Sequence, residues 1–464
     1  MKKLCLLSWL LLLCGACQRE DEVSHAPLGP IPAFEQRPGD PARGREALLN
    51  EPYITCGIPE TAYRRLFPPP PESQRIAGRK GPNATLPYFL THYRTPQGVE
   101  LIVPNCLNCH AATIAGKFIL GVGNEQRDFT EDPLMNVESA GLYLTDPGEI
   151  AEWQRWDARL SAIAPFMITD TVGVNPANNI TLALMAHRDP ETLAWSGQPL
   201  MEPPPKHPLP VSVPPWWRLA KKNALYYNAE GRGDLARAMM LGAIYCAENV
   251  ATLETIDRYA PDILAFFASL QPPKFPWPID EALARRGKAV FESTCARCHG
   301  TYGEHPSYPN LVIGLEEVGT DPLLARFGID GSGDRFIRWF NRSYFGRLSH
   351  AEPAAGYVPP PLDGIWATAP FLHNGSVPTL ATLLDSRKRP AYWVRSFDTD
   401  DYDPEQIGWR YQTLEHGKSA AKDGKERKRI YDTSLPGYSN RGHTFGDQLT
   451  EEERKALLEY LKTL

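Results

Sequence analysis

Two short segments of the chain contain a pair of cysteines followed at once by a histidine. They read CLNCH, ending at His110, and CARCH, ending at His299. On one turn of helix, cysteines three residues apart present both sulfurs to the two vinyl groups of a porphyrin, and the next imidazole reaches the iron. CxxCH is the attachment signal of c-type haem. The sequence therefore predicts two covalently bound c-type haems, attached at Cys106, Cys109, Cys295 and Cys298 and ligated by His110 and His299.

A redox dithiol or a zinc site made from the four cysteines would explain the cysteine pairs alone. Neither explains a histidine at the same offset in both segments, nor the export pattern at the N-terminus. We therefore favour haem at both segments.

The N-terminus has the pattern of an export signal. Two lysines precede an apolar run from Leu4 to Leu13, which is short for a bilayer span but typical of a signal peptide. The run closes on CGAC, which resembles a bacterial lipobox with Cys14 in place of the usual leucine. We expect a signal peptide at 1–16 and a lipid anchor at Cys17, which would place the protein in the periplasm on the outer membrane. An ordinary cleaved signal and a retained membrane helix are the alternatives.

Cys56 and Cys246 remain once the cysteines of the N-terminus and of the haem segments are set aside. In an oxidising periplasm unpaired thiols are a liability, so one interpretation is a disulfide between them. The other is two free thiols, because the sequence does not show whether they meet in space.

The composition excludes several classes of protein. Of the 464 residues, 42% are hydrophobic and 22% are charged, which excludes a disordered chain and a polytopic membrane protein. The formal net charge is -6 and no basic stripe alternates with aromatic residues, so nucleic acid is not expected as a partner. The 45 prolines are roughly twice the usual number and predict long irregular connections.

Helical patterns flank the second haem segment. The apolar residues of 280–294 have the spacing of an amphipathic helix that runs into Cys295. Thr450 and Glu453 have the spacing of a capping box in front of a leucine-rich helical face. We expect these two helices to cross and pack as in cytochrome c folds. A further helix, from Leu253 to Leu270, should end at a proline-rich linker.

These patterns predict a mainly α chain with two cytochrome c-type haem domains and extensive irregular loops rich in proline and glycine. The predicted boundaries are a signal peptide at 1–16, an N-terminal arm at 17–95, and haem domains at 96–272 and 278–464. The approach to the first haem segment, GVELIVPN, does not look helical, which departs from the simple cytochrome pattern.

The distribution of methionine bears on the sixth iron ligands. All seven methionines precede Cys295, so the second haem domain has no methionine of its own. Its sixth ligand is then a later histidine, a methionine from the other domain, or absent. The later histidines are His305, His350, His373, His416 and His443. The first haem has other candidates: Met135, Met167, Met185, Met201, Met239, Met240, His187 and His207.

The run PPPLDGIWATAPFLHNGSVPTLATLL, residues 359–384, resembles a signature of bacterial di-haem cytochrome c peroxidases and their relatives. Within that superfamily the closest likeness is to the di-haem rubber oxygenase branch. Three further segments support the resemblance: CLNCHAATIAGK, VPPWWRLAKKNALYYNAEGRGD (213–234) and GYSNRGHTFGDQLTEEERKALLEYLKTL (437–464).

The resemblance implies roles for four further residues. His443 matches a histidine of the rubber oxygenase branch that ligates the C-terminal iron, and His373 matches a histidine that lies close to a haem. The residues alone leave a solvated loop histidine and a core histidine as alternatives. Tyr226 and Tyr227 match an aromatic pair between the haems, which usually contains tryptophan. The neighbouring pair Trp216 and Trp217 is interpreted as core.

The resemblance also implies a function. The haem on His110 would react with peroxide or dioxygen, the haem on His299 would transfer electrons, and Tyr227 would lie between them. The expected partners are small electron-transfer proteins and an organic substrate that the sequence does not identify, with membrane contact only through Cys17. The alternative is a non-catalytic periplasmic electron carrier in which both irons are six-coordinate.

Overall fold

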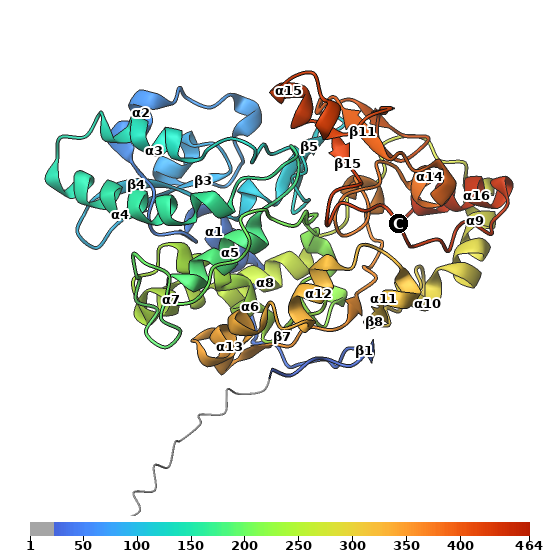
Figure 1. The fold of residues 1–464 in the computed structure, drawn as a ribbon, viewed down its shortest axis with the longest axis horizontal. Helices are drawn as coiled ribbons and strands as arrows, with labels where there is room; N and C mark the ends of the chain where they lie inside the picture. The colour runs from blue at the N-terminus through green and yellow to red at the C-terminus, as the bar shows by residue number, and fades with distance from the viewer. Residues whose placement is uncertain (1–22) are drawn as a thin grey trace, which may run out of the picture.

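The computed structural model describes residues 23–464, whose arrangement is shown in Figure 1. The predicted signal peptide at 1–16 and the predicted lipid anchor at Cys17 lie outside the described residues. Within residues 23–464, none of the helices is long and apolar enough to span a membrane.

The second CxxCH segment follows a helix that packs on the C-terminal helix of the chain. Helix α9 (Glu281–Thr294) runs directly into Cys295. Helix α16 (Glu451–Leu461) begins with the predicted capping box, in which Thr450 and Glu453 each accept a hydrogen bond from the other's backbone N–H. Both predicted helices are confirmed, and they lie side by side at the right of Figure 1.

The crossing of α9 and α16 depends on Gly287. A Cβ atom at this position would stand 1.9 Å from the carbonyl oxygen of Ala456. Any side chain would therefore push the two helices apart. The rings of Phe291 and Tyr460, with centroids 5.2 Å apart, continue the contact along the pair.

A similar pair of helices lies in the first half of the chain. Helix α1 (Pro41–Asn50) crosses α8 (Ala260–Ser269), and a Cβ atom at Gly44 would stand 1.8 Å from the carbonyl oxygen of Asp262. In the second half the crossing helix runs straight into the cysteines, whereas here α1 ends far before Cys106. The first CxxCH segment follows strand β4 (Glu100–Pro104) instead, which accounts for the non-helical pattern of its approach.

The predicted helix from Leu253 to Leu270 is two helices. Helix α7 (Val250–Asp257) ends before α8, and Pro261 lies in the first turn of α8. A proline in the first turn costs no helical hydrogen bond, but it prevents the preceding helix from continuing through it.

The strands form small antiparallel sheets of two or three strands. They are β1 (Gly29–Pro30), β8 (Leu311–Gly314) and β10 (Gly356–Tyr357); β14 (Tyr411–Thr413), β11 (Tyr392–Arg395) and β15 (Tyr431–Asp432); β2 (Ile58–Pro59), β4 (Glu100–Pro104) and β3 (Leu90–Arg94); β12 (Tyr402–Asp403) and β13 (Gly408–Trp409); β5 (Ala111–Ile114) and β6 (Lys117–Leu120); β7 (Gly231–Gly233) and β9 (Ser349–Ala351). The other helices are α2 (Glu60–Leu66), α3 (Leu134–Gly141), α4 (Pro147–Ile163), α5 (Ala177–Ala186), α6 (Leu235–Met239), α10 (Ala296–His299), α11 (Leu315–Val318), α12 (Leu323–Ile329), α13 (Asp334–Arg342), α14 (Leu380–Leu383) and α15 (Gly424–Arg427).

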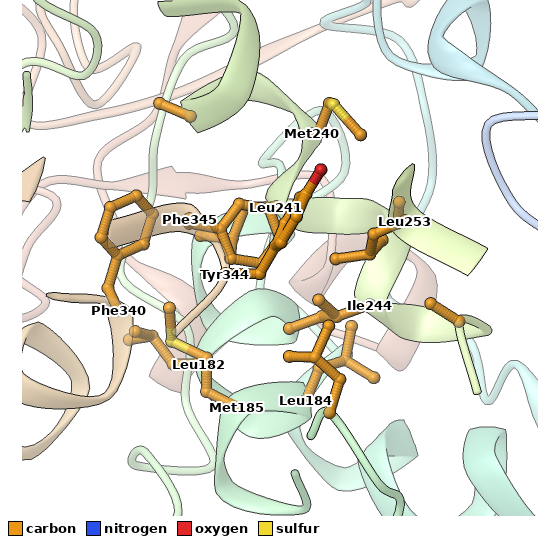
Figure 2. Packing of buried hydrophobic residues seen from close by; sticks show 14 of the residues in the cluster. Leu182, Leu184, Met185, Met240, Leu241, Ile244, Leu253, Phe340, Tyr344 and Phe345 are labelled. Carbon is orange, nitrogen blue, oxygen red and sulfur yellow. The ribbon is translucent and has the colours of Figure 1, made fainter. Parts of the chain in front are cut away.

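The largest apolar core contains residues from both halves of the chain. Leu182, Met185 and Ile244 belong to the first half, and they pack with Phe340 and Phe345 from the second half (Figure 2). The sheets cross between the halves in the same way, because β7 pairs with β9 and β1 pairs with β8.

These features correct the predicted fold class. The chain is 39% helical and 13% strand, with several small sheets, so it is not mainly α. Nor do residues 23–464 form two distinct cytochrome domains, since α13 of the second half packs into the core of the first. The prediction rested on local helical patterns around the haem segments. Such patterns do not show that residues of one half of the chain pack into the core of the other half. The residue boundaries of the domains stay a prediction.

The structure decides between the two interpretations of the remaining cysteines. Cys56 and Cys246 form a disulfide across a sequence separation of 190 residues. Both cysteines are fully buried. The bridge ties the chain just before β2 to the chain just before α7, both within the first half.

Candidate haem-binding site

The first CxxCH segment is a tight turn between two strands. Asn105 ends the approach from β4, and its side chain accepts a hydrogen bond from the backbone N–H of Leu107 at 2.9 Å. Its amide group donates to the hydroxyl of Thr91 at 2.9 Å. The backbone N–H of His110 then bonds the carbonyl of Cys106 at 3.1 Å, which closes one helical turn over the two cysteines.

The His110 imidazole packs against aromatic rings, and the residue is partly exposed. It stacks on Trp216 with ring centroids 4.7 Å apart, and Trp216 stacks in turn on Phe267 of α8 at 3.7 Å. Burial lowers the pKa of His110 to about 4, so the ring is neutral at physiological pH. The neutral imidazole is the form that binds a metal. Trp216 is buried, as expected of a core residue, and it also sets the orientation of His110.

A cavity of about 1260 Å³ opens beside this turn. Cys106, Cys109 and His110 lie on its wall, together with many apolar and aromatic side chains. The volume exceeds the ~300–1,000 Å³ of ordinary ligand pockets, so a large planar group and a further molecule can share it. The cavity extends to Pro360 in the second half of the chain.

The cavity divides the sixth-ligand candidates of the first haem into two groups. Four methionines lie on its wall: Met167, Met185, Met239 and Met240. The other four candidates do not line it. His207 and Met135 are exposed, Met201 is partly exposed, and the Nδ1 atom of His187 bonds the carbonyl of Ser196 at 3.0 Å.

The second CxxCH segment is held in a different way. His299 ends the short helix α10, and its Nδ1 lies 2.8 Å from the carbonyl oxygen of Pro360. A carbonyl only accepts, so Nδ1 carries the proton and Nε2 is left for a metal, as in most metal-binding histidines. Burial lowers the pKa of His299 to about 4.

His443 faces His299 across the second site. Their ring centroids are 6.1 Å apart. With metal–nitrogen bonds of roughly 2 Å and about 1 Å from nitrogen to ring centre, two imidazoles on one metal ion have centroids about 6 Å apart. Burial, followed by the neighbouring His299, lowers the pKa of His443 to about 3.

The backbone at His443 is held from two sides. Its N–H donates to the carbonyl of Val318 at 2.7 Å. The guanidinium of Arg389 donates to the carbonyls of Gly442 at 2.6 Å and His443 at 3.0 Å. His443 has a φ of +45°, a conformation uncommon for a residue other than glycine, and these bonds hold it there.

His373 and Tyr227 are neighbours. His373 is buried, its ring stacks on Tyr357 with centroids 4.2 Å apart, and Tyr227 lies at 6.1 Å. The Tyr227 hydroxyl donates to the carbonyl of Ser212 at 2.9 Å. Tyr227 and the adjacent Tyr226 line the large cavity, whose wall also contains Cys106, Cys109 and His110.

Sequence reasoning missed four residues of these sites. Trp216 stacks on His110, Pro360 orients His299, and Arg218 and Lys222 line the cavity. Charged residues within the otherwise apolar run WWRLAKKNALYY were the sequence signal that could have identified Arg218 and Lys222.

The residues present fit haem. Among residues 23–464 there is no group of three or more His, Cys, Asp or Glu side chains that could hold a metal ion alone. One or two histidines beside a CxxC pair is the donor set that haem needs, because the porphyrin supplies the other four iron ligands. The first segment offers a cavity for it, and the second offers an opposed pair of imidazoles.

Residues 356–394 match the family described as RoxA-like, cytochrome c-like. This segment contains Pro360, which bonds His299, and His373. The match supports the predicted rubber oxygenase-like branch, and a cytochrome c-like family implies covalently bound haem. It indicates a haem-containing oxidoreductase. Membership of the wider peroxidase superfamily and a second haem stay predictions.

Two curated relatives come from Sinorhizobium fredii (strain NBRC 101917 / NGR234). The chain is 31% identical to the uncharacterized protein y4iJ, over 43% of this chain and 42% of the relative. It is 29% identical to the uncharacterized protein y4iM, over 43% of this chain and 52% of the relative. The chain thus matches about half the length of these relatives.

Proposed function

We propose that the protein is an exported di-haem oxidoreductase of the peroxidase or oxygenase type, whose oxidant reacts at the first site and whose second site transfers electrons. The observation that carries the proposal is the difference between the two histidine sites. His110 lines a cavity of about 1260 Å³, whereas His299 faces His443. A cavity leaves room for an oxidant beside the iron, and a second imidazole fills that position.

Haem supplies redox chemistry that protein side chains lack, and the protein supplies binding, orientation and electrostatics. Cys106 and Cys109 would form the two thioether bonds, and Trp216 holds the plane of His110 by stacking. The apolar wall excludes water and favours an apolar organic substrate.

Tyr227 is proposed as the relay between the two sites. It lines the cavity of the first site, whose wall also contains Pro360 of the second site, and its ring lies beside that of His373. Burial raises its pKa above the usual range, so the phenol keeps its proton at physiological pH. A tyrosine forms a cation radical less readily than a tryptophan, so Tyr227 should give a slower relay than the tryptophan usual in the family.

The proposal includes the periplasm as location and an outer-membrane lipid anchor at Cys17. The disulfide between Cys56 and Cys246 supports an oxidising compartment. The proposed partners are small electron-transfer proteins, peroxide or dioxygen, and an organic substrate.

Carbon monoxide binding to the reduced protein tests the proposal. We expect one haem to bind carbon monoxide and the other to stay low-spin. His110→Ala should abolish oxidation while leaving the low-spin spectrum of the second haem nearly intact. Stopped-flow mixing with peroxide and with dioxygen then identifies the oxidant, and Tyr227→Phe should slow electron transfer between the haems without preventing ligand binding.

The alternative is an electron carrier, with one of the four cavity methionines as sixth ligand of the first iron. It predicts that neither haem binds carbon monoxide and that neither responds to peroxide or dioxygen. That result would contradict the proposed enzymatic function and favour the electron carrier.

A further inference from the structure

Arg218 is a buried cation without a carboxylate partner. It is 5% exposed and lies on the short helix Trp216–Lys221. Its Nε atom donates to the backbone carbonyl of Asp363 at 3.0 Å, and its Nη2 atom has no hydrogen-bond partner within residues 23–464. The side chain lies on the wall of the large cavity.

Lys222 is a second cation on the same wall. Its ammonium group makes no hydrogen bond or ion pair with any group of the described chain. Burial and the charge of Arg218 lower its pKa to about 8. The adjacent Lys221 is different, because its Nζ atom lies 2.7 and 2.8 Å from the two carboxylate oxygens of Asp363.

The acidic residues of the cavity wall do not compensate these two cations. Glu230 is hydrogen-bonded to Asn228 at 3.3 Å and forms an ion pair with neither cation. Asp128 and Glu131 pair with Lys428 elsewhere on the wall. Removing a cation from water without an anion costs several kcal/mol, so buried cations are usually paired. Arg218, buried and unpaired, therefore points to an anionic ligand, and the partly exposed Lys222 is a second unpaired cation beside it. Arg127 is a third cation on the wall, but its guanidinium lies over the rings of Phe89 and Phe129.

We propose that Arg218 and Lys222 bind the two carboxylates of the haem attached through Cys106 and Cys109. The inference rests on the proposed haem at that site. The thioethers and the carboxylates lie on different parts of the porphyrin edge, and the cavity wall offers cysteines for the first and cations for the second. A guanidinium with a free Nη2 suits a carboxylate, and the ammonium group supplies a second point charge.

A fatty acid bound in the cavity would present the same carboxylate chemistry. The haem is favoured because it stays bound and so compensates the cations permanently.

The test measures the midpoint potentials of both haems in the haem-loaded protein between pH 5 and pH 9. Loss of a cation beside the iron favours the ferric form, so Arg218→Gln and Lys222→Met should each lower the potential of the first haem. We expect at least a tenfold change in the ferric to ferrous ratio, which is about 59 mV for a one-electron couple. The freed carboxylate should also make that potential depend on pH.

Lys221→Met is the matched control. It removes the same charge one residue away, but from an ammonium group already paired with Asp363. The potential of the first haem should stay within a threefold change in the same ratio. Arg218→Lys keeps the charge, so the potential of its first haem should stay close to that of the parent protein. If Arg218→Gln does not fold, Lys222→Met alone tests the inference.

Haem counting separates the failure of this inference from that of the proposed function. If both haems are attached and the potential of the first haem is unchanged in Arg218→Gln and Lys222→Met, the assignment of these cations to the haem carboxylates is overturned and the proposed function stands. If Cys106 and Cys109 carry no haem, both are overturned. Added decanoate tests the fatty-acid alternative. The inference is wrong, and the cations bind a substrate carboxylate, if two results hold together: decanoate perturbs the first haem of the parent protein but not that of Arg218→Gln, and the two proteins have equal potentials without decanoate.

Discussion

His299 and His443 oppose each other with ring centroids 6.1 Å apart, although they are far apart in the sequence. The ring of His299 is held by a backbone carbonyl, whereas at His443 it is the backbone that is held, and the ring Nδ1 has no hydrogen-bond partner within residues 23–464. Pro360 accepts from Nδ1 of His299, and Arg389 bonds the carbonyl of His443. The separation of the two imidazoles is compatible with the proposed ligation of one iron ion by both.

His443→Ala should convert the second haem from low-spin to high-spin and allow it to bind carbon monoxide, because one of the two imidazoles is removed. Absorption and electron paramagnetic resonance spectra measure the change. His305→Ala, an exposed histidine in the same half, is the control and should leave both spectra as they are. An unchanged low-spin spectrum in His443→Ala would exclude this residue as the ligand.

Cys56→Ala together with Cys246→Ala should destabilise the protein by about 2–5 kcal/mol, the usual effect of removing a native disulfide. The bridge spans 190 residues, so its loss frees a long loop of the unfolded chain. The urea midpoint, compared with that of the parent protein under reducing and oxidising conditions, measures the effect. Equal midpoints for the parent and the double variant under oxidising conditions would contradict it.

Gly287→Ala should lower the melting temperature and disturb the second haem, because the new methyl group would collide with the carbonyl of Ala456. Overpacking of this kind costs about 1–3 kcal/mol. Thermal unfolding followed in the haem absorption band measures it. Gly197→Ala is the control, since a Cβ atom there meets nothing within 4 Å. The prediction fails if the two variants melt together.

Glu125 should make stability depend on pH. Burial raises its pKa from 4.5 to about 7, although Arg395 lies close by. The folded state therefore favours the protonated form, and this contribution is complete below pH 4.5, is lost as the pH rises, and is gone above pH 7. At 1.36 kcal/mol per pKa unit the loss is about 3 kcal/mol.

Glu125→Gln keeps a carbonyl oxygen for the Ser212 hydroxyl and the Val213 N–H, which now bond the carboxylate at 2.8 and 2.9 Å. The difference between the urea midpoint of Glu125→Gln and that of the parent protein should therefore shift in favour of Glu125→Gln as the pH rises from 5 to 8. Glu304→Gln, at an exposed position, serves as the control. A constant difference between Glu125→Gln and the parent across this range would refute the pH dependence.

The sequence by itself determined the features that depend on residues a few positions apart. The CxxCH pairs, the capping box at Thr450 and the helix before Cys295 each lie within a short window of sequence, where residue type acts directly on local geometry. The failure at Leu253 to Leu270 is of the same local kind, because Pro261 marked the break and was not used.

Only the tertiary structure decided which distant residues meet. Cys56 pairs with Cys246, Phe340 packs into the core of the first half, and Trp216 stacks on His110. Such contacts are selected by the burial of apolar surface over the whole chain, and no short window of sequence contains both partners. For the same reason the sequence predicted two haem segments but not the shared core that joins the two halves of the chain.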